Sequence, residues 1–310
     1  MRWRQALPLL VLALSCLAGC VTVKVDLFEE PKPLKEKVVS GRGRDKILLM
    51  DISGLLTDSP RRGFKSLFGG TDAARIKEEL EKAGKDPRIK AVVLRINSPG
   101  GMVSGADLMH HELLAFKREH RVPVIAALMG VAASGGYYVA QAADVIVAQP
   151  TGITGSIGVV ALKPNLKGLM DKAGVEAEVV KSGQFKDFWS PFKPATPEEK
   201  RLMEGIIADF YGRFVEVVAQ GRGLEARQVR PLADGRIFTA AQAKDLGLVD
   251  RLGYLDDALT LARERAGLTD ARVVVYHRPG SHRPTIYSLA PEILEWGPRF
   301  FYLWLGEDPS

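Results

Sequence analysis

Residues 130–138 of this 310-residue chain read G-V-A-A-S-G-G-Y-Y and follow the apolar run at 122–128. A continuous apolar run of this length is typical of a strand buried on both faces. The residues after it predict a helix that begins near Ser134. The alanines and glycines beside Ser134 are small and leave room for another group to approach its hydroxyl. The stretch therefore predicts a strand, a turn and a helix, with an accessible serine at the turn.

A second turn of the same kind occurs earlier in the chain. Residues 97–101 read N-S-P-G-G and follow the apolar run at 91–96. Glycines allow close backbone approach, and such a turn can point N–H groups at a developing oxyanion. Either turn alone is weak evidence, because a serine beside glycines at a strand end is usually a helix cap. Together they could face each other, with the amides of Gly100, Gly101 and Gly135 as candidate oxyanion donors.

Strand and helix patterns alternate along the body of the chain. This alternation predicts an α/β fold with one catalytic domain over residues 46–277. The predicted strands cover residues 47–52, 91–96, 122–128, 144–148, 157–162, 175–181 and 272–276. The predicted helices cover residues 71–83, 103–116, 134–142, 197–219, 240–246 and 255–265.

The longest predicted helix, at 197–219, has clear start signals. Thr196, Pro197 and Glu199 supply an N-cap, a first-turn proline and a capping box. Apolar residues then recur at helical spacing, which predicts a buried stripe. The stripe consists of Leu202, Ile206, Phe210, Phe214 and Val217.

The first residues have the pattern of an export signal. Arg2 and Arg4 precede a short apolar run, and residues 17–20 read L-A-G-C. This pattern resembles the lipobox of bacterial lipoproteins. The resemblance implies a signal peptide at 1–19 and a lipidated Cys20 as the first mature residue. An ordinary cleaved signal or an uncleaved anchor are the alternatives. Residues 20–45, with prolines and glycines among mixed charges, are expected to form a linker from the membrane.

Composition excludes several classes of site. The formal net charge is +6, but basic and acidic residues are interleaved, so no stripe for nucleic acid is expected. Both cysteines, Cys16 and Cys20, lie in the signal region. The body therefore has no thiol nucleophile and no zinc-thiolate site, and we expect neither metal nor cofactor.

The end of the chain, residues 278–310, differs from the body. Five aromatic residues gather between Trp296 and Trp304. Such a cluster is typical of a packing segment or subunit contact. An aromatic belt at a membrane interface is the alternative.

A serine nucleophile needs a base. All five histidines are expected at the surface, so a Ser-His-Asp triad has no convincing base. They are His110, His111, His120, His277 and His282. A lysine can serve where desolvation disfavours the ammonium, and Ser-Lys is a known variant of the triad. Lys186 lies among aromatic residues in S-G-Q-F-K-D-F-W, although a surface lysine fits the pattern too, and Lys181 is a rival.

The motifs G-V-A-A-S-G-G-Y-Y-V-A, N-S-P-G-G and K-S-G-Q-F-K-D together resemble the signal peptide peptidase A family of bacterial serine-lysine proteases. The resemblance covers about residues 45–277. It implies Ser134 as nucleophile, Lys186 as base and Ser156 as the residue that orients the lysine amine. It further implies a Clp-protease or crotonase-like α/β spiral.

The same resemblance implies biological context. Members degrade remnant signal peptides and form rings in which each serine meets a neighbour's lysine. A membrane-anchored enzyme of the bacterial envelope, with its catalytic domain outside the cytoplasm, is expected. Two other classes stay open: an acyl-CoA hydratase or isomerase on the same fold, and a non-catalytic envelope scaffold. An exported protein would rarely meet CoA, which argues against the first.

Overall fold

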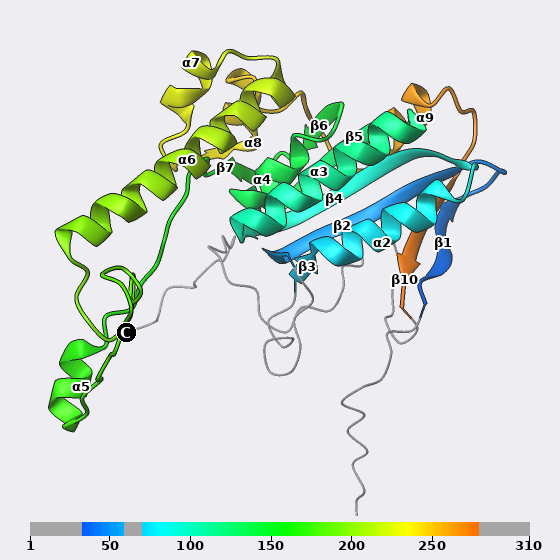
Figure 1. Ribbon diagram of the computed structural model, residues 1–310. Coiled ribbons are helices and arrows are strands. Elements are labelled where there is room, and N and C mark those ends of the chain that lie inside the picture. The colour runs from blue at the N-terminus through cyan, green and yellow to red at the C-terminus, as the bar shows by residue number, and fades with distance from the viewer. Residues whose placement is uncertain (1–32, 59–69, 279–310) are drawn as a thin grey trace, which may run out of the picture. The chain divides into compact units, whose positions relative to one another are not determined.

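The computed structural model describes residues 33–58 and 70–278. The predicted signal peptide, Cys20 and the aromatic cluster near Trp296 lie outside these residues. The described residues from Leu34 onward belong to one compact unit. In them a single mixed sheet is flanked by helices, which confirms the α/β class (Figure 1).

Ten strands of the described residues form this sheet, in the order β1-β10-β2-β4-β5-β6-β9, with β3 beside β2, and β7 between β5 and β8. Neighbours are parallel except for β1 with β10 and β7 with β8. The strands are β1 (Lys35–Gly41), β2 (Lys46–Thr57), β3 (Gly70–Asp72), β4 (Ile89–Gly101), β5 (Val124–Ala133), β6 (Val145–Ala148), β7 (Ile153–Gly155), β8 (Ile237–Thr239), β9 (Arg251–Leu252) and β10 (Arg272–His277).

The helices connect successive strands. They are α2 (Ala73–Gly84), α3 (Val103–His120), α4 (Gly135–Ala140), α5 (Lys167–Ala173), α6 (Pro197–Arg222), α7 (Ala226–Val229), the 3₁₀ turn η2 (Arg230–Leu232), α8 (Ala240–Asp245) and α9 (Leu255–Arg265).

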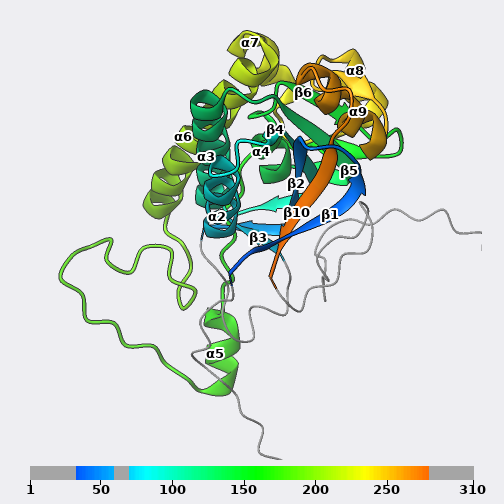
Figure 2. The ribbon, with the colours of Figure 1, turned by 90° about the vertical axis from the view of Figure 1, so that its right-hand side faces the viewer.

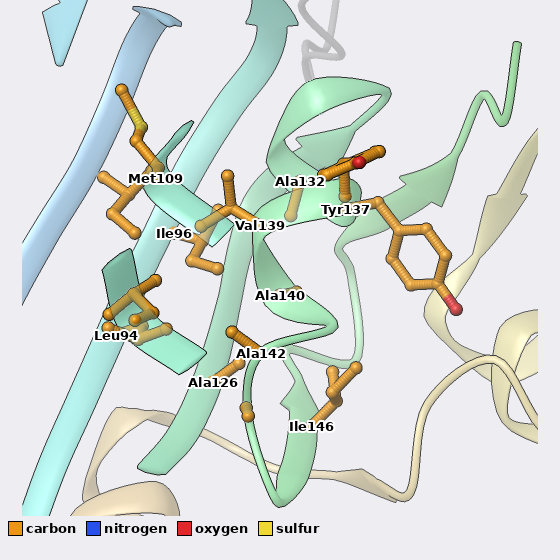
Figure 3. Close-up of a cluster of buried hydrophobic side chains, with 14 of the residues drawn as sticks. Leu94, Ile96, Met109, Ala126, Ala132, Tyr137, Val139, Ala140, Ala142 and Ile146 are labelled. Carbon is orange, nitrogen blue, oxygen red and sulfur yellow. The ribbon is translucent and has the colours of Figure 1, made fainter. Parts of the chain in front are cut away.

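The sheet has a hydrophobic core on each face, because side chains alternate along a strand. On β4, Val92, Leu94 and Ile96 belong to the larger core, together with residues of α2, α3, α4 and α6. Ala91 and Val93 point to the opposite face and pack with α9. Figure 2 shows α2 and α3 on one side of the sheet and α9 on the other. Figure 3 shows part of the larger core, where β4, β5 and α4 meet.

Two predicted strands are wrong. Residues 157–162 and 175–181 form no strand. The strand near the first of these stretches is β7, which ends before residue 157. Apolar residues in both stretches are exposed, for example Leu162 at 85% and Val180 at 94%. Because no strand among the described residues pairs with them, their β-branched and apolar character does not produce a strand.

Two further expectations need correction. The predicted linker contains β1, which pairs with β10 at the sheet edge. The predicted stripe of α6 is buried only in its second half, at Phe214 and Val217. Leu202, Ile206 and Phe210 are more than 40% exposed, since α4 packs against the later turns of the helix, where Phe214 contacts Tyr138.

Candidate active site

Ser134 lies at the junction of β5 and α4, as the sequence predicts. Its backbone is in an unusual conformation, with φ 52° and ψ −122°. Two backbone hydrogen bonds hold it there. Ser134 N donates to the carbonyl of Gly155 on β7 (2.8 Å), and Tyr138 N donates to the carbonyl of Ser134 (2.9 Å). A strained residue persists only when its surroundings impose it, so the position of this serine is well defined.

The two glycine turns meet at this serine. A Cβ built on Gly100 would lie 2.8 Å from Gly135 N and 3.1 Å from Ser134 Oγ. A Cβ built on Gly135 would lie 3.3 Å from Gly101 N. The stretch 97–101 is the end of β4 rather than a free turn. The amide of Gly100 already donates to Ser98 Oγ (3.1 Å).

A cavity of about 500 Å³ opens on one side of Ser134. Its walls come from the start of α3, from α4 and from the second half of α6. Most of the lining is apolar, including Met102, Val159, Phe210 and Phe214. The charged residues among the described lining residues are Asp107 and Arg213.

A second cavity, of about 540 Å³, also borders Ser134, and its lining includes Ser156. Ser156 also has a positive φ, 50°, and its amide donates to the carbonyl of Arg236 (2.7 Å). Glu204 and Asp234 contribute carboxylates to the wall. Ser134 and Ser156, which are 22 positions apart in the chain, are thus brought to one cavity.

Lys186 is exposed and, within the described part of the chain, lines neither cavity. It lies on a series of turns, where Lys186 N donates to the carbonyl of Gly183 (3.1 Å) and Phe188 N to that of Phe185 (3.0 Å). Burial by its own subunit, the expected source of a neutral amine, is therefore not found in the single chain.

The rival Lys181 is committed to other partners. Its Nζ donates to Asp187 Oδ1 (2.8 Å) and to the carbonyl of Gln184 (3.1 Å). Of these two lysines, Lys186 is the one whose amine has no hydrogen-bond or ion-pair partner among the described residues.

The described histidines do not provide a base at Ser134. No described histidine lines either cavity beside this serine. The prediction that all histidines lie at the surface is wrong for His110, which is 6% exposed and packs edge-on against Tyr138 at 5.4 Å between ring centroids. Burial lowers the pKa of His110 to about 4. His282 lies outside the described residues.

The described residues contain no cluster of His, Cys, Asp and Glu that could hold a metal ion. The same residues include no helix with the length and apolar character required to cross a bilayer. Sequence reasoning missed Asp107 and Arg213, which are 106 positions apart and meet only through the packing of α3 against α6.

Comparison with known proteins defines the class of this site. Residues 116–269 match the model of Peptidase family S49. A protein of Enterococcus faecium named "Putative signal peptide peptidase SppA" is 35% identical over 84% of this chain and 75% of its own length. Protease 4 of Salmonella typhi is 38% identical over 71% of this chain and 34% of its own length. Among solved structures, a ClpP1 mutant of Listeria monocytogenes has a TM-score of 0.42 and 16% identity, covering 70% of this chain and 95% of that one.

The family model and the two sequence relatives define a peptidase. The chain belongs to peptidase family S49, and the predicted resemblance to the signal peptide peptidase A family is confirmed.

Proposed function

We propose that this protein is a membrane-associated serine endopeptidase of the bacterial envelope, with Ser134 as nucleophile and Lys186 as base. The observation that carries the proposal is the position of Ser134, held in a strained turn between two cavities and against Gly100 and Gly135. A peptidase of this family needs a nucleophile that a peptide carbonyl can reach, and this serine meets that requirement.

The reaction is acyl transfer. The neutral amine of Lys186 takes the proton of Ser134 Oγ while Oγ forms a bond to the peptide carbonyl carbon. The tetrahedral intermediate then expels the amine of the product, which receives that proton. Water, deprotonated by Lys186, attacks the acyl-enzyme and releases Ser134. We assign the oxyanion to the amides of Gly101 and Gly135, since the amide of Gly100 donates to Ser98 Oγ. Gly100 contributes the absence of a side chain.

The two cavities have different roles. The first cavity, with its apolar lining, receives a substrate side chain next to the scissile bond. The second, which contains Ser156, receives the amine of Lys186, and Ser156 orients it.

Lys186 comes to this site from a neighbouring subunit. Its exposure and its absence from the described walls of both cavities support this arrangement. The segment that carries it exposes apolar side chains such as Val160 at 76% and Leu169 at 66%. Contact between subunits in a ring would cover such surface and desolvate the amine.

The substrates are remnant signal peptides. The names of relatives such as the Enterococcus faecium protein support this substrate class, and the export signal with its lipobox supports an envelope location. Lipidated Cys20 would hold the enzyme at the membrane where such apolar peptides are released.

The test is cleavage of fluorogenic peptides with apolar residues by the full chain, purified in detergent. Ser134→Ala and Lys186→Ala should each lower kcat/KM by several orders of magnitude, as loss of a triad member does. Lys172→Ala, an exposed lysine of the same segment, is the matched control and should retain activity. A fluorophosphonate should label the wild type but not Ser134→Ala. A chain that neither cleaves nor is labelled would instead be a scaffold with an inactive site.

A further inference from the structure

The first cavity beside Ser134 has a wall in which one negative and one positive side chain are paired. We propose that the pair Asp107–Arg213 is a specificity-determining element, which restricts this cavity to uncharged substrate side chains. The inference rests on the proposed function, in which this cavity receives the substrate residue next to the scissile bond.

Three elements bring the pair together. Asp107 comes from α3, Arg213 from α6 and Tyr138 from α4. Arg213 donates to Asp107 Oδ1 through Nη2 (3.1 Å) and Nε (3.3 Å). The hydroxyl of Tyr138 donates to the same oxygen. Asp107 Oδ2 accepts no hydrogen bond from any described residue, so one oxygen of the carboxylate stays available to a ligand.

Both charges are accessible. The side chain of Asp107 is 42% exposed and that of Arg213 is 51% exposed, while Tyr138 is buried. The remaining lining is largely apolar, with Met102 and Phe214 at the cavity wall. Within the described lining, a substrate side chain therefore meets a hydrophobic surface and one ion pair.

The carboxyl of Asp107 is charged at neutral pH. Burial opposes its ionisation, but the hydrogen bonds from Tyr138 and Arg213 outweigh burial and hold the pKa below the ordinary value. The wall thus carries one charge of each sign and no net charge.

This balance disfavours charged side chains of either sign. A substrate ammonium near Asp107 would gain attraction to the carboxylate and lose a comparable amount to repulsion from Arg213. It would also lose part of its hydration where it contacts the apolar part of the wall. An apolar side chain incurs neither cost and gains from burial. Discrimination against the wrong charge is an established way to obtain specificity.

Single substitutions should reverse this balance in opposite directions. Arg213→Gln leaves the carboxylate of Asp107 uncompensated, so kcat/KM for a peptide with Lys next to the scissile bond should rise about tenfold relative to the peptide with Leu. Asp107→Asn leaves Arg213 uncompensated, so the Glu peptide should gain by a similar factor. The double variant Asp107→Asn with Arg213→Gln has no charge in the wall and should again prefer Leu.

The experiment compares Leu, Lys and Glu peptides of otherwise identical sequence with the full chain. Arg227→Gln removes an arginine that is 81% exposed and paired with Glu225, away from the cavity, and should leave all ratios unchanged. Arg213→Lys keeps the charge and should keep the preference for Leu, and thermal melting verifies that each variant is folded.

The inference would be overturned if the kcat/KM ratios of the Lys and Glu peptides to the Leu peptide stay within about twofold of the wild type in both single variants. Ser134-dependent cleavage would in that case still support the proposed function. If the wild type hydrolyses none of the peptides, the proposed function fails. Binding of the same peptides to Ser134→Ala, followed by fluorescence polarisation, then decides the inference. Tighter binding of the Lys peptide than of the Glu peptide when Arg213→Gln is added to Ser134→Ala supports it, and equal binding of the two peptides contradicts it.

Discussion

Gly100 lies so close to Ser134 that a Cβ at position 100 would be 3.1 Å from the serine Oγ and 2.9 Å from its Cβ. The φ of Gly100 is +108°, a conformation that side chains rarely adopt. Position 100 therefore has neither the space nor the backbone geometry for another residue. This contact joins the end of β4 to the junction of β5 and α4.

We expect Gly100→Ala to displace Ser134 and to lower kcat/KM by at least about 100-fold, the scale seen when a group at an oxyanion site is lost. The matched control is Gly130→Ala, where the nearest atom to an added Cβ is Asn97 Oδ1 at 3.8 Å. That distance is an ordinary contact, so Gly130→Ala should stay active. Equal activity in both variants would show that the approach of Gly100 to Ser134 does not matter for catalysis.

Mixing two inactive chains tests whether the dyad forms between subunits. With Ser134→Ala and Lys186→Ala chains refolded together, about a quarter of the interfaces in a randomly mixed ring pair an intact serine with an intact lysine. Activity should recover to a corresponding fraction of the wild type. Each variant refolded alone is the control and should stay inactive. Mixed rings shown by mass spectrometry but without activity would place both residues of the dyad in one chain.

Asp187 should hold the segment that carries Lys186. Its Oδ1 accepts from Lys181 (2.8 Å) and its Oδ2 pairs with Lys193 (3.0 Å), which donates in turn to Glu199 (2.7 Å) in the capping box of α6. Asp187→Asn should speed amide hydrogen exchange across residues 160–196 and lower kcat more than it changes KM. Asp171→Asn, which breaks the exposed pair with Lys167 in the same segment, should do neither.

The same network sets a pH limit for that segment. Hydrogen bonds from Lys181 and Lys193 lower the pKa of Asp187 to about 2. A carboxyl with a depressed pKa in the folded state stabilises at pH values above its ordinary pKa, and that stabilisation is lost as the pH falls through the depressed value. Protection factors in residues 160–196, which correct for the intrinsic exchange rate at each pH, should therefore be high at neutral pH and fall only towards pH 2. A fall in protection centred near neutral pH would contradict the role of Asp187.

His110 should make the fold sensitive to mild acid. Burial lowers its pKa from 6.5 to about 4, so between these values the unfolded chain binds a proton that the folded chain does not. The free energy of unfolding is therefore unaffected by the titration of His110 above pH 6.5. It falls as the pH drops towards 4, by up to about 3 kcal/mol. His110→Phe should flatten this dependence in denaturant titrations. His111→Phe, at an exposed position of the same helix, should preserve the slope.

Cys20 should carry lipid. The L-A-G-C sequence places it directly after a short apolar run, as in bacterial lipoproteins. Intact-mass and N-terminal peptide analysis of protein from membranes should find a lipidated N-terminal Cys20. Cys20→Ser should release the protein from the membrane fraction without lowering peptidase activity in detergent. An unmodified Cys20, or a different mature N-terminus, would contradict this prediction.

Local pattern was enough to locate much of the framework. The apolar run at 91–96 lies within β4, most of the run at 122–128 belongs to β5, and the start signals at Thr196 and Glu199 open α6 as predicted. These features depend on interactions between residues near in sequence or on strands buried on both faces, so composition and spacing reveal them. The sequence pattern also places Ser134 at its strand-helix junction.

Pattern failed where burial depended on distant segments. Apolar residues at 157–162 and 175–181 predicted strands, yet Leu162 and Val180 are exposed because no strand in the described part of the chain pairs with them. The predicted stripe of α6 was wrong at Leu202 and Ile206, which are exposed because α4 packs against the later turns of the helix, at Phe214. Periodicity records which side chains could be buried, whereas coverage by another element decides which of them are.

The sequence by itself therefore determined the α/β class, the peptidase motifs and the serine that we propose as nucleophile. Only the tertiary structure decided that Gly100 touches Ser134, that Ser156 shares a cavity with it, and that Asp107 meets Arg213 across 106 positions. The physical reason is the range of the interactions. Propensity, capping and side-chain periodicity act within a few residues, but a cavity and its charges are made by elements that the sheet brings together from distant parts of the chain.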